Sequence, residues 1–346
     1  MSPGLPKLQK KPMEKPPGLP EIPRAVASAR RAGNHPSSPA ATSHAVRALL
    51  AHREQLDDRV GSRCNILGSM IGVKVRDGKT LPGVGITYFV REKIPLNELT
   101  PRSRIPKVLQ LDDKRIVTDV MVWRETEQHS LKDTRILMDQ ATQGTLTAFA
   151  ETSSGLFGLT CGHCLLGADQ NPTTRTEICM DATPSPLVWT PIGMSALVLF
   201  LNGGPLLLGG KGYVDCGLFS LSEVTLRTRA EASKLVQMAE WTSLPGQILY
   251  GVSTVDAVSG DNHQRQAKVL GVQGYALDEF CDVVLDAAAP GMRRGDSGML
   301  WFTSQMRAAA IHCRGEYVDQ SNGSVRITAM SAQRAAAALG FKYRIG

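Results

Sequence analysis

Residues 295–298 read Gly-Asp-Ser-Gly, a serine held in a glycine-bounded turn, and this stretch decides how the rest of the chain is interpreted. Two earlier stretches belong with it. Residues 158–164 read Gly-Leu-Thr-Cys-Gly-His-Cys, and residues 213–221 read Tyr-Val-Asp-Cys-Gly-Leu-Phe-Ser-Leu. The chain therefore presents a histidine, an aspartate and a serine, in that order, within short segments of small and apolar residues.

These three residue types meet the needs of nucleophilic catalysis. The Ser297 hydroxyl is a poor nucleophile until a base takes its proton, and the His163 imidazole suits that task because it titrates near neutral pH. Asp215 would orient the imidazole and stabilise its protonated form. The glycines beside Ser297 permit a tight turn, in which the N–H groups of Gly295 and Ser297 could form an oxyanion hole.

The second part of the chain has the texture of a β-protein. From residue 144 onward, short apolar segments alternate with Gly, Pro and Ser, which predicts an all-β barrel or sandwich. An Ala-rich helix over 331–339, ended by Gly340, closes the chain. The expected strands are 145–150, 155–160, 197–201, 213–220, 267–271, 283–287, 298–302, 308–312 and 325–329.

Together, the three motifs resemble the trypsin/chymotrypsin superfamily of serine peptidases, which uses the same order of His, Asp and Ser. The resemblance implies a mainly β fold with a chymotrypsin-like double six-stranded β-barrel. It also implies a serine endopeptidase that works through His163, Asp215 and Ser297 and an acyl-enzyme, with a protein or peptide as its substrate. The motifs call for no cofactor and no metal ion.

The substrate pocket is expected next to the nucleophile. Trypsin has an aspartate six residues before its serine, and this chain has Gly291 there, so a preference for Arg or Lys is not indicated. Residues 311–315, Ile-His-Cys-Arg-Gly, are similar to those of viral relatives and glutamyl endopeptidases, in which the histidine contacts Glu or Gln. By this resemblance His312 lines the pocket, Arg314 and Gly315 lie at its rim, and Glu or Gln is favoured.

Two features concern activation and compartment. Residues 135–136, Arg-Ile, resemble the cleavage site that frees a new N-terminus to pair with Asp296, although no Gly-Gly follows. The seven cysteines are odd in number, and Cys164 lacks the upstream partner that secreted members use. Because disulfides form in oxidising compartments, we expect a cytoplasmic protein with reduced thiols.

We expect the chain to have three regions, two of which precede the peptidase domain. Residues 1–43, which are rich in Pro and Lys, predict a disordered basic arm. Residues 44–135 predict a small α/β module and linker, with a helix from 44 to about 60, strands at 65–76, 84–90 and 115–123, and a charged linker over 126–143. This module resembles the leader of bacterial and plant trypsin-like proteins of unknown role. The peptidase domain is expected over 136–346.

The composition limits the classes of partner that this chain is expected to bind. The 42% hydrophobic and 21% charged residues are typical of a globular protein, and no apolar run is long enough to span a membrane. We expect no secretory signal, because the first 25 residues lack an apolar core. Most of the net charge of +7 belongs to the arm, which has no aromatic residues to stack on bases, so nucleic-acid binding is not expected.

Two other functions stay open at this stage. The protease fold could serve as a catalytically silent binding or regulatory protein. Alternatively, the Cys-x-x-Cys of residues 161–164 could hold zinc or act as a redox pair. An endopeptidase inside a cell needs restraint, so we expect narrow specificity and a regulatory protein partner or limited proteolysis.

Overall fold

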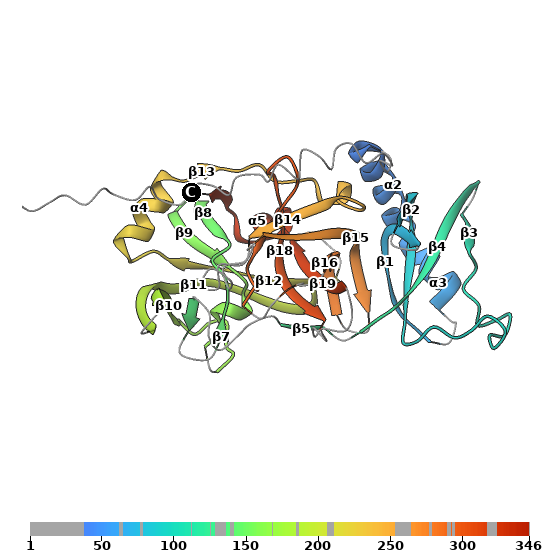
Figure 1. The fold of residues 1–346 in the computed structure, drawn as a ribbon, viewed down its shortest axis with the longest axis horizontal. Coiled ribbons are helices and arrows are strands. Elements are labelled where there is room, and N and C mark those ends of the chain that lie inside the picture. The colour runs from blue at the N-terminus through green and yellow to red at the C-terminus, as the bar shows by residue number, and fades with distance from the viewer. Residues whose placement is uncertain are drawn as a thin grey trace, which may run out of the picture.

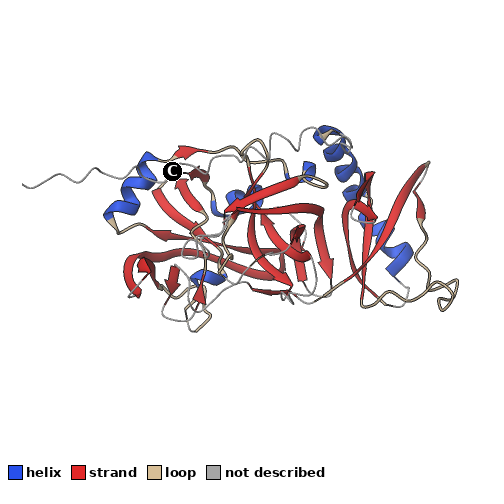
Figure 2. Cartoon of the chain, viewed as in Figure 1, coloured by secondary structure: helices blue, strands red, loops and turns tan. Residues whose placement is uncertain are grey.

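A computed structural model describes most of the chain beyond the arm (Figures 1 and 2). The described residues are 38–61, 65–76, 79–111, 113–124, 126–128, 136–138, 142–167, 169–184, 187–205, 211–252, 264–276, 279–288, 292, 295–316 and 324–345. Strands dominate, as expected. Within these residues, none of the helices has the length and apolar character needed to cross a bilayer.

Six strands of the C-terminal part close into a barrel. They follow the order β14-β17-β18-β19-β16-β15, and β14 pairs with β15 to complete the ring. Alternate side chains point inward and bury Trp301, Val283 and Leu285. The strands are β14 (Ile248–Val252), β15 (Gln264–Ala276), β16 (Glu279–Ala288), β17 (Leu300–Phe302), β18 (Ala308–Glu316) and β19 (Ser324–Ser331).

A second sheet, of nine strands, lies beside this barrel, and together they confirm the mainly β fold class with a closed six-stranded barrel. Where a second six-stranded barrel was expected, the described strands form this nine-stranded sheet. Its order is β13-β20-β8-β9-β12-β11-β10-β6-β7. The strands are β6 (Ile136–Met138), β7 (Thr142–Gln143), β8 (Ala148–Thr152), β9 (Gly155–Thr160), β10 (Glu177–Pro184), β11 (Leu187–Pro205), β12 (Lys211–Ser220), β13 (Lys234–Leu235) and β20 (Lys342–Ile345).

Short helices fill the spaces around the two sheets. They are the single turns η1 (His163–Leu165) and η2 (Trp241–Ser243), with α4 (Val224–Ala232) and α5 (Ala332–Leu339). The predicted C-terminal helix is confirmed as α5, which buries Ala332, Ala335 and Leu339. It ends at Gly340, whose φ of 67° is a left-handed conformation that glycine adopts at low cost.

The N-terminal region is joined to the barrel by backbone pairing. Strand β1 pairs with β15, so the barrel sheet continues through β1, β2 and β4 to β3 (Figure 1). The helices pack against this extension, and Val46 and Leu56 share one apolar core with Val269 of the barrel. The elements are α2 (Pro39–Ala51), α3 (Arg53–Gly61), β1 (Ile66–Arg76), β2 (Lys79–Val90), β3 (Val108–Leu111) and β4 (Lys114–Val122).

Two expectations for this region need correction. The helix begins at Pro39, inside the segment expected to be a disordered arm, because the Ser38 side chain accepts a hydrogen bond from the Ala41 N–H and proline suits the first helical position. The segment expected to be a linker contains β5 (Thr126–Gln128) as well as β6 and β7. These strands are too short to show periodicity: long-range pairing forms β5 and β6, and β7 pairs with β6.

Candidate active site

The structure brings His163 and Asp215 together across neighbouring strands. His163 begins η1 directly after β9, and Asp215 lies in β12, which pairs with β9. The backbone N–H of His163 donates to Asp215 Oδ1 at 2.8 Å, and its ring Nδ1 lies 2.6 Å from Asp215 Oδ2. Both side chains are buried. The carboxylate therefore contacts the histidine at its backbone and at its ring, and Nε2 takes no part in these two contacts.

Burial and charge act in opposite directions on His163. Burial alone would lower the pKa of the imidazole, because it disfavours the charged form. The negative charges of Asp215 and Cys164 and their hydrogen bonds raise it, and the net pKa lies well above the usual value for histidine. The site therefore favours an imidazolium, the form that a general base takes once it has accepted a proton.

Ser297 lies in a turn between β16 and β17 of the closed barrel. The flanking Gly295 and Gly298 have φ values of 96° and 94°, which L-residues rarely adopt. A Cβ on Gly298 would collide with the carbonyl oxygen of Thr145. Position 298 therefore needs glycine both for its backbone conformation and for the space available. The Thr145 N–H donates to the Ser297 carbonyl at 2.7 Å and fixes the turn to the segment that leads into β8 of the nine-stranded sheet.

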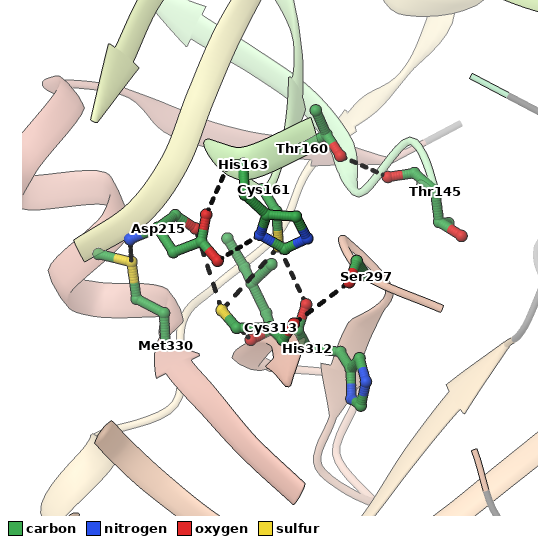
Figure 3. Close-up of polar contacts among 10 residues, drawn as sticks. Thr145, Thr160, Cys161, His163, Asp215, Ser297, His312, Cys313 and Met330 are labelled. Atoms are coloured by element: carbon green, nitrogen blue, oxygen red, sulfur yellow. Dashed lines mark hydrogen bonds and ion pairs between the residues drawn. The ribbon is translucent and has the colours of Figure 1, made fainter. Parts of the chain in front are cut away.

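The Ser297 hydroxyl faces a carbonyl in this conformation. It donates to the Cys313 carbonyl oxygen at 3.2 Å. In Figure 3 the His163 ring lies between Asp215 and Ser297, with Nε2 on the side of the serine. That Nε2 is buried and has no hydrogen-bond partner in the described part of the chain. All three side chains are buried.

The two backbone groups expected to form an oxyanion hole are also buried. Among the described residues, the N–H groups of Gly295 and Ser297 donate no hydrogen bond. The carbonyl of Gly295 is occupied, because it accepts from the Thr145 hydroxyl at 2.7 Å. The two N–H groups thus remain available as donors on a turn that is otherwise bonded in place.

The expected pocket residues follow the serine along β18. His312 is fully buried, and its ring centroid lies 6.4 Å from that of Trp301. Figure 3 shows its ring directed away from His163. Arg314 is half-buried, and Gly315 is buried. Gly291 lies outside the described residues.

The expected cleavage site is described only in part. Arg135 lies outside the described residues, whereas Ile136 starts β6 and pairs with Met180 of β10. Asp296 is fully buried, and its carbonyl accepts from the Met299 N–H at 2.8 Å. Activation by cleavage between residues 135 and 136 stays a prediction.

A group of buried thiols surrounds the His163–Asp215 pair, and the sequence motifs revealed only part of it. Cys161 Sγ donates to the His312 carbonyl at 3.0 Å and lies 3.9 Å from Cys313 Sγ. Burial raises the pKa of Cys161. Burial acts the same way on Cys164, but hydrogen bonding to Cys161 and the charge of His163 outweigh it and lower the Cys164 pKa to about 6. The Cys-x-x-Cys spacing indicated the first two thiols, whereas the fold alone adds Cys313.

One set of side chains has the composition of a metal site. Potential ligand atoms of Cys161, His163 and Asp215 all lie within 4.8 Å of one another, and all three residues are buried. Thiolate, imidazole and carboxylate are ligands that Zn²⁺ accepts. The 2.6 Å contact between His163 and Asp215 is a hydrogen bond, however, and is shorter than the roughly 3.3 Å between two ligand atoms on one tetrahedral zinc ion.

Comparisons with known proteins give structural matches only. No protein-family model matches the chain, and no curated protein matches it in sequence. Protease A of Thermobifida fusca is similar in structure, with 15% identity over 62% of this chain and 98% of that one and a TM-score of 0.38. A Glu endopeptidase has 14% identity over 62% of this chain and 94% of that one, with a TM-score of 0.34. The MamO protease domain of Magnetospirillum magneticum has 13% identity over 59% and 93%, with a TM-score of 0.33.

Proposed function

We propose that this protein is a serine endopeptidase in which Ser297 is the nucleophile, His163 the general base and Asp215 the orienting carboxylate. The observation that carries the proposal is the pair of hydrogen bonds from the backbone N–H and ring Nδ1 of His163 to the two carboxylate oxygens of Asp215. Nε2 has no partner in the described part of the chain and lies on the side of Ser297. Such an imidazole has one free nitrogen in a fixed tautomer, which general-base catalysis requires.

In the proposed reaction, the Ser297 hydroxyl first leaves the Cys313 carbonyl, which costs about 1 kcal/mol for a neutral hydrogen bond. Nε2 of His163 then takes the hydroxyl proton while Oγ attacks the substrate carbonyl carbon. The N–H groups of Gly295 and Ser297 stabilise the negative oxygen. Nε2 passes the proton to the leaving amine, and water hydrolyses the resulting acyl-enzyme by the same route.

For the substrate we propose a protein or peptide with Glu or Gln at the residue before the cleaved bond. The support is the imidazole of His312 with Arg314 on the same strand, since donors and a positive charge favour an acidic or amide side chain. A positional-scanning peptide library tests this. A strong preference for Lys, Arg or large apolar residues at that position would refute it. We further propose a cytoplasmic protein restrained by a regulatory partner or by limited proteolysis.

The first test of the function is reaction of the purified chain with a small fluorophosphonate probe, which labels only activated serines. We expect labelling of the wild type at Ser297 and its loss in Ser297→Ala and His163→Ala, with an unchanged far-ultraviolet circular dichroism spectrum in both. Failure of all forms to label, before and after limited trypsin treatment, would favour a catalytically silent protein on a protease fold.

A metal-binding protein is the second candidate, and the grouping of Cys161, His163 and Asp215 favours it. Elemental analysis of protein purified without chelators separates the two functions. One equivalent of zinc that disappears in Cys161→Ser, together with no fluorophosphonate labelling, would support the metal protein. Labelling of a metal-free protein would support the peptidase.

A further inference from the structure

We propose that β5, residues 126–128, is an internal stand-in for a peptide substrate, and that its removal from β18 opens the catalytic site. This inference rests on the proposed peptidase function. Its basis is a backbone pairing between the segment expected to be a linker and β18, which follows Ser297 in the sequence. The pairs are Arg314 with Gln128, Gly315 with Glu127, and Glu316 with Thr126.

The pairing pattern shows which edge of β18 is occupied. Arg314 and Gly315 pair with β19 as well as with β5, so the two partners must lie on opposite sides of β18. Strand β17 also lies opposite β19, because Ala310 and Ile311 pair with both. Strand β5 therefore occupies the same edge as β17, further along β18.

The nucleophile stands between these two strands on that edge. Further along β18, beyond the residues paired with β17, the turn that carries Ser297 contacts this edge. There the Gly298 N–H donates to the His312 carbonyl at 2.8 Å. The Ser297 hydroxyl meets the next carbonyl, that of Cys313. The pairing with β5 begins at the following residue of β18, Arg314. The backbone that an extended peptide could use beside the serine is thus already paired.

The direction of β5 determines which of its ends approaches the nucleophile. It runs antiparallel to β18, so its C-terminal end, Gln128, lies nearest Ser297. A peptide that replaced it in the same direction would bring the carbonyl of a residue beyond the paired segment toward the nucleophile. Peptides add to open sheet edges mainly through backbone hydrogen bonds, so an internal strand and a substrate compete for one site.

The simpler interpretation is that β5 only ties the N-terminal region to the barrel. That interpretation predicts that loosening β5 leaves peptide reactivity unchanged or lowers it with stability. Competition predicts the opposite, because a site that is open in a small fraction of molecules gains apparent affinity as that fraction rises. If the open form is about 1–10% of the population, releasing β5 should raise reactivity toward peptides about 10–100-fold.

The test uses proline to remove backbone donors from β5 without touching the proposed catalytic residues. In an antiparallel pair, hydrogen-bonded positions alternate, so the double variant Glu127→Pro/Gln128→Pro removes at least one paired N–H whichever register bonds. Gln110→Pro is the matched control, because it places proline in the exposed edge strand β3, away from the site. Single prolines at 127 and 128 show which donor matters.

Two probes are compared on the full-length chain. The first is the small fluorophosphonate. The second is a set of tetrapeptidyl diphenyl phosphonates with Glu, Gln, Leu or Lys at the reacting residue, which need the β18 edge. We expect the double variant to react at least tenfold faster than wild type with the best peptide probe, and Gln110→Pro to react at the wild-type rate. Equal rates for wild type and double variant would overturn the inference.

The two probes distinguish failure of the proposed peptidase function from failure of the proposed role of β5. If no form reacts with the small probe, the peptidase function fails. If the small probe reacts but the peptide probes do not distinguish the variants, only the role of β5 fails. Hydrogen exchange tests for misfolding: those amides of residues 314–316 that face β5 should exchange faster in the double variant, while those of β19 stay protected. If the whole barrel loses protection, the triple-glycine replacement of 126–128 takes its place, with the same expected direction.

Discussion

The imidazole of His163 is buried, with the Asp215 carboxylate at its Nδ1 and the Cys164 thiol beside it. Burial lowers its pKa, but Asp215 and Cys164 raise it further than burial lowers it. An imidazolium cannot take the serine proton, so activity should rise with pH through the raised pKa. The stability that the charged form contributes is fully present below the pKa of the unfolded chain and is lost as pH rises through the folded-state pKa.

The first prediction concerns this titration. The rate of fluorophosphonate labelling, measured against pH, should have an acid limb with its midpoint above about 6.5, the ordinary value for histidine. Cys164→Ser should move the midpoint downward, because it removes one of the negative charges that raise the pKa. Cys179→Ser, a half-buried thiol of β10, is the control and should leave it unchanged. A wild-type midpoint at or below about 6.5 would contradict this account.

At the scale of elements, α3 is fastened to two strands by one side chain. Arg53 donates to the Ser69 carbonyl of β1 at 2.7 Å and to the Ser69 hydroxyl at 2.9 Å, and it also donates to the Gln273 carbonyl of β15. Asp57 balances its charge at 3.3 Å. Because the guanidinium reaches both strands where they pair, it ties the N-terminal helix to the barrel sheet.

The second prediction is that Arg53→Ala lowers the free energy of unfolding by about 1–3 kcal/mol, because it removes a charged donor from two partly buried carbonyls. Arg227→Ala is the matched control. Its pair with Glu231 also spans four residues on a helix but is exposed, so we expect a loss of no more than about 0.5 kcal/mol. Urea unfolding monitored by tryptophan fluorescence measures both. Similar losses in the two variants would show that the contacts of Arg53 do not stabilise the junction.

At the scale of the whole molecule, the N-terminal region and the closed barrel share a sheet and a core. Residues 271–276 of β15 pair with β1, and Tyr88 of β2 belongs to the same apolar cluster as Trp301 of the barrel. Removing the first region would expose a strand edge and apolar surface together. Such surfaces promote aggregation.

The third prediction follows from this junction. Residues 136–346 alone, the extent predicted for the peptidase domain, should be insoluble or unfold at a lower denaturant concentration than the full chain. Co-expression of residues 38–124 as a separate chain should restore solubility, because it returns β1 to β15. A monomeric 136–346 fragment as stable as the full chain would instead establish two independent domains.

The sequence by itself determined the local features. Alternating apolar residues located most of the strands, although β2, β11, β15, β16 and β18 extend beyond the predicted ends. Gly340 marked the end of α5. Helix α4 was missed because its buried residues, Leu226 and Ala230, make only a short apolar stripe, and its N-terminus is capped by the Glu223 carboxylate. The three motifs also named His163 and Asp215, which the fold joins at 2.6 Å.

Only the tertiary structure decided how distant segments pair. The joining of β1 to β15, the place of β5 on β18 and the approach of Cys313 to Cys161 link residues far apart in the chain. A strand as short as β5 has no periodicity of its own, and its pairing is stable only once the barrel presents an edge. Residue patterns record the local preferences of the backbone and side chains. Long-range pairing depends on burial and on hydrogen bonds that exist only after the chain has folded.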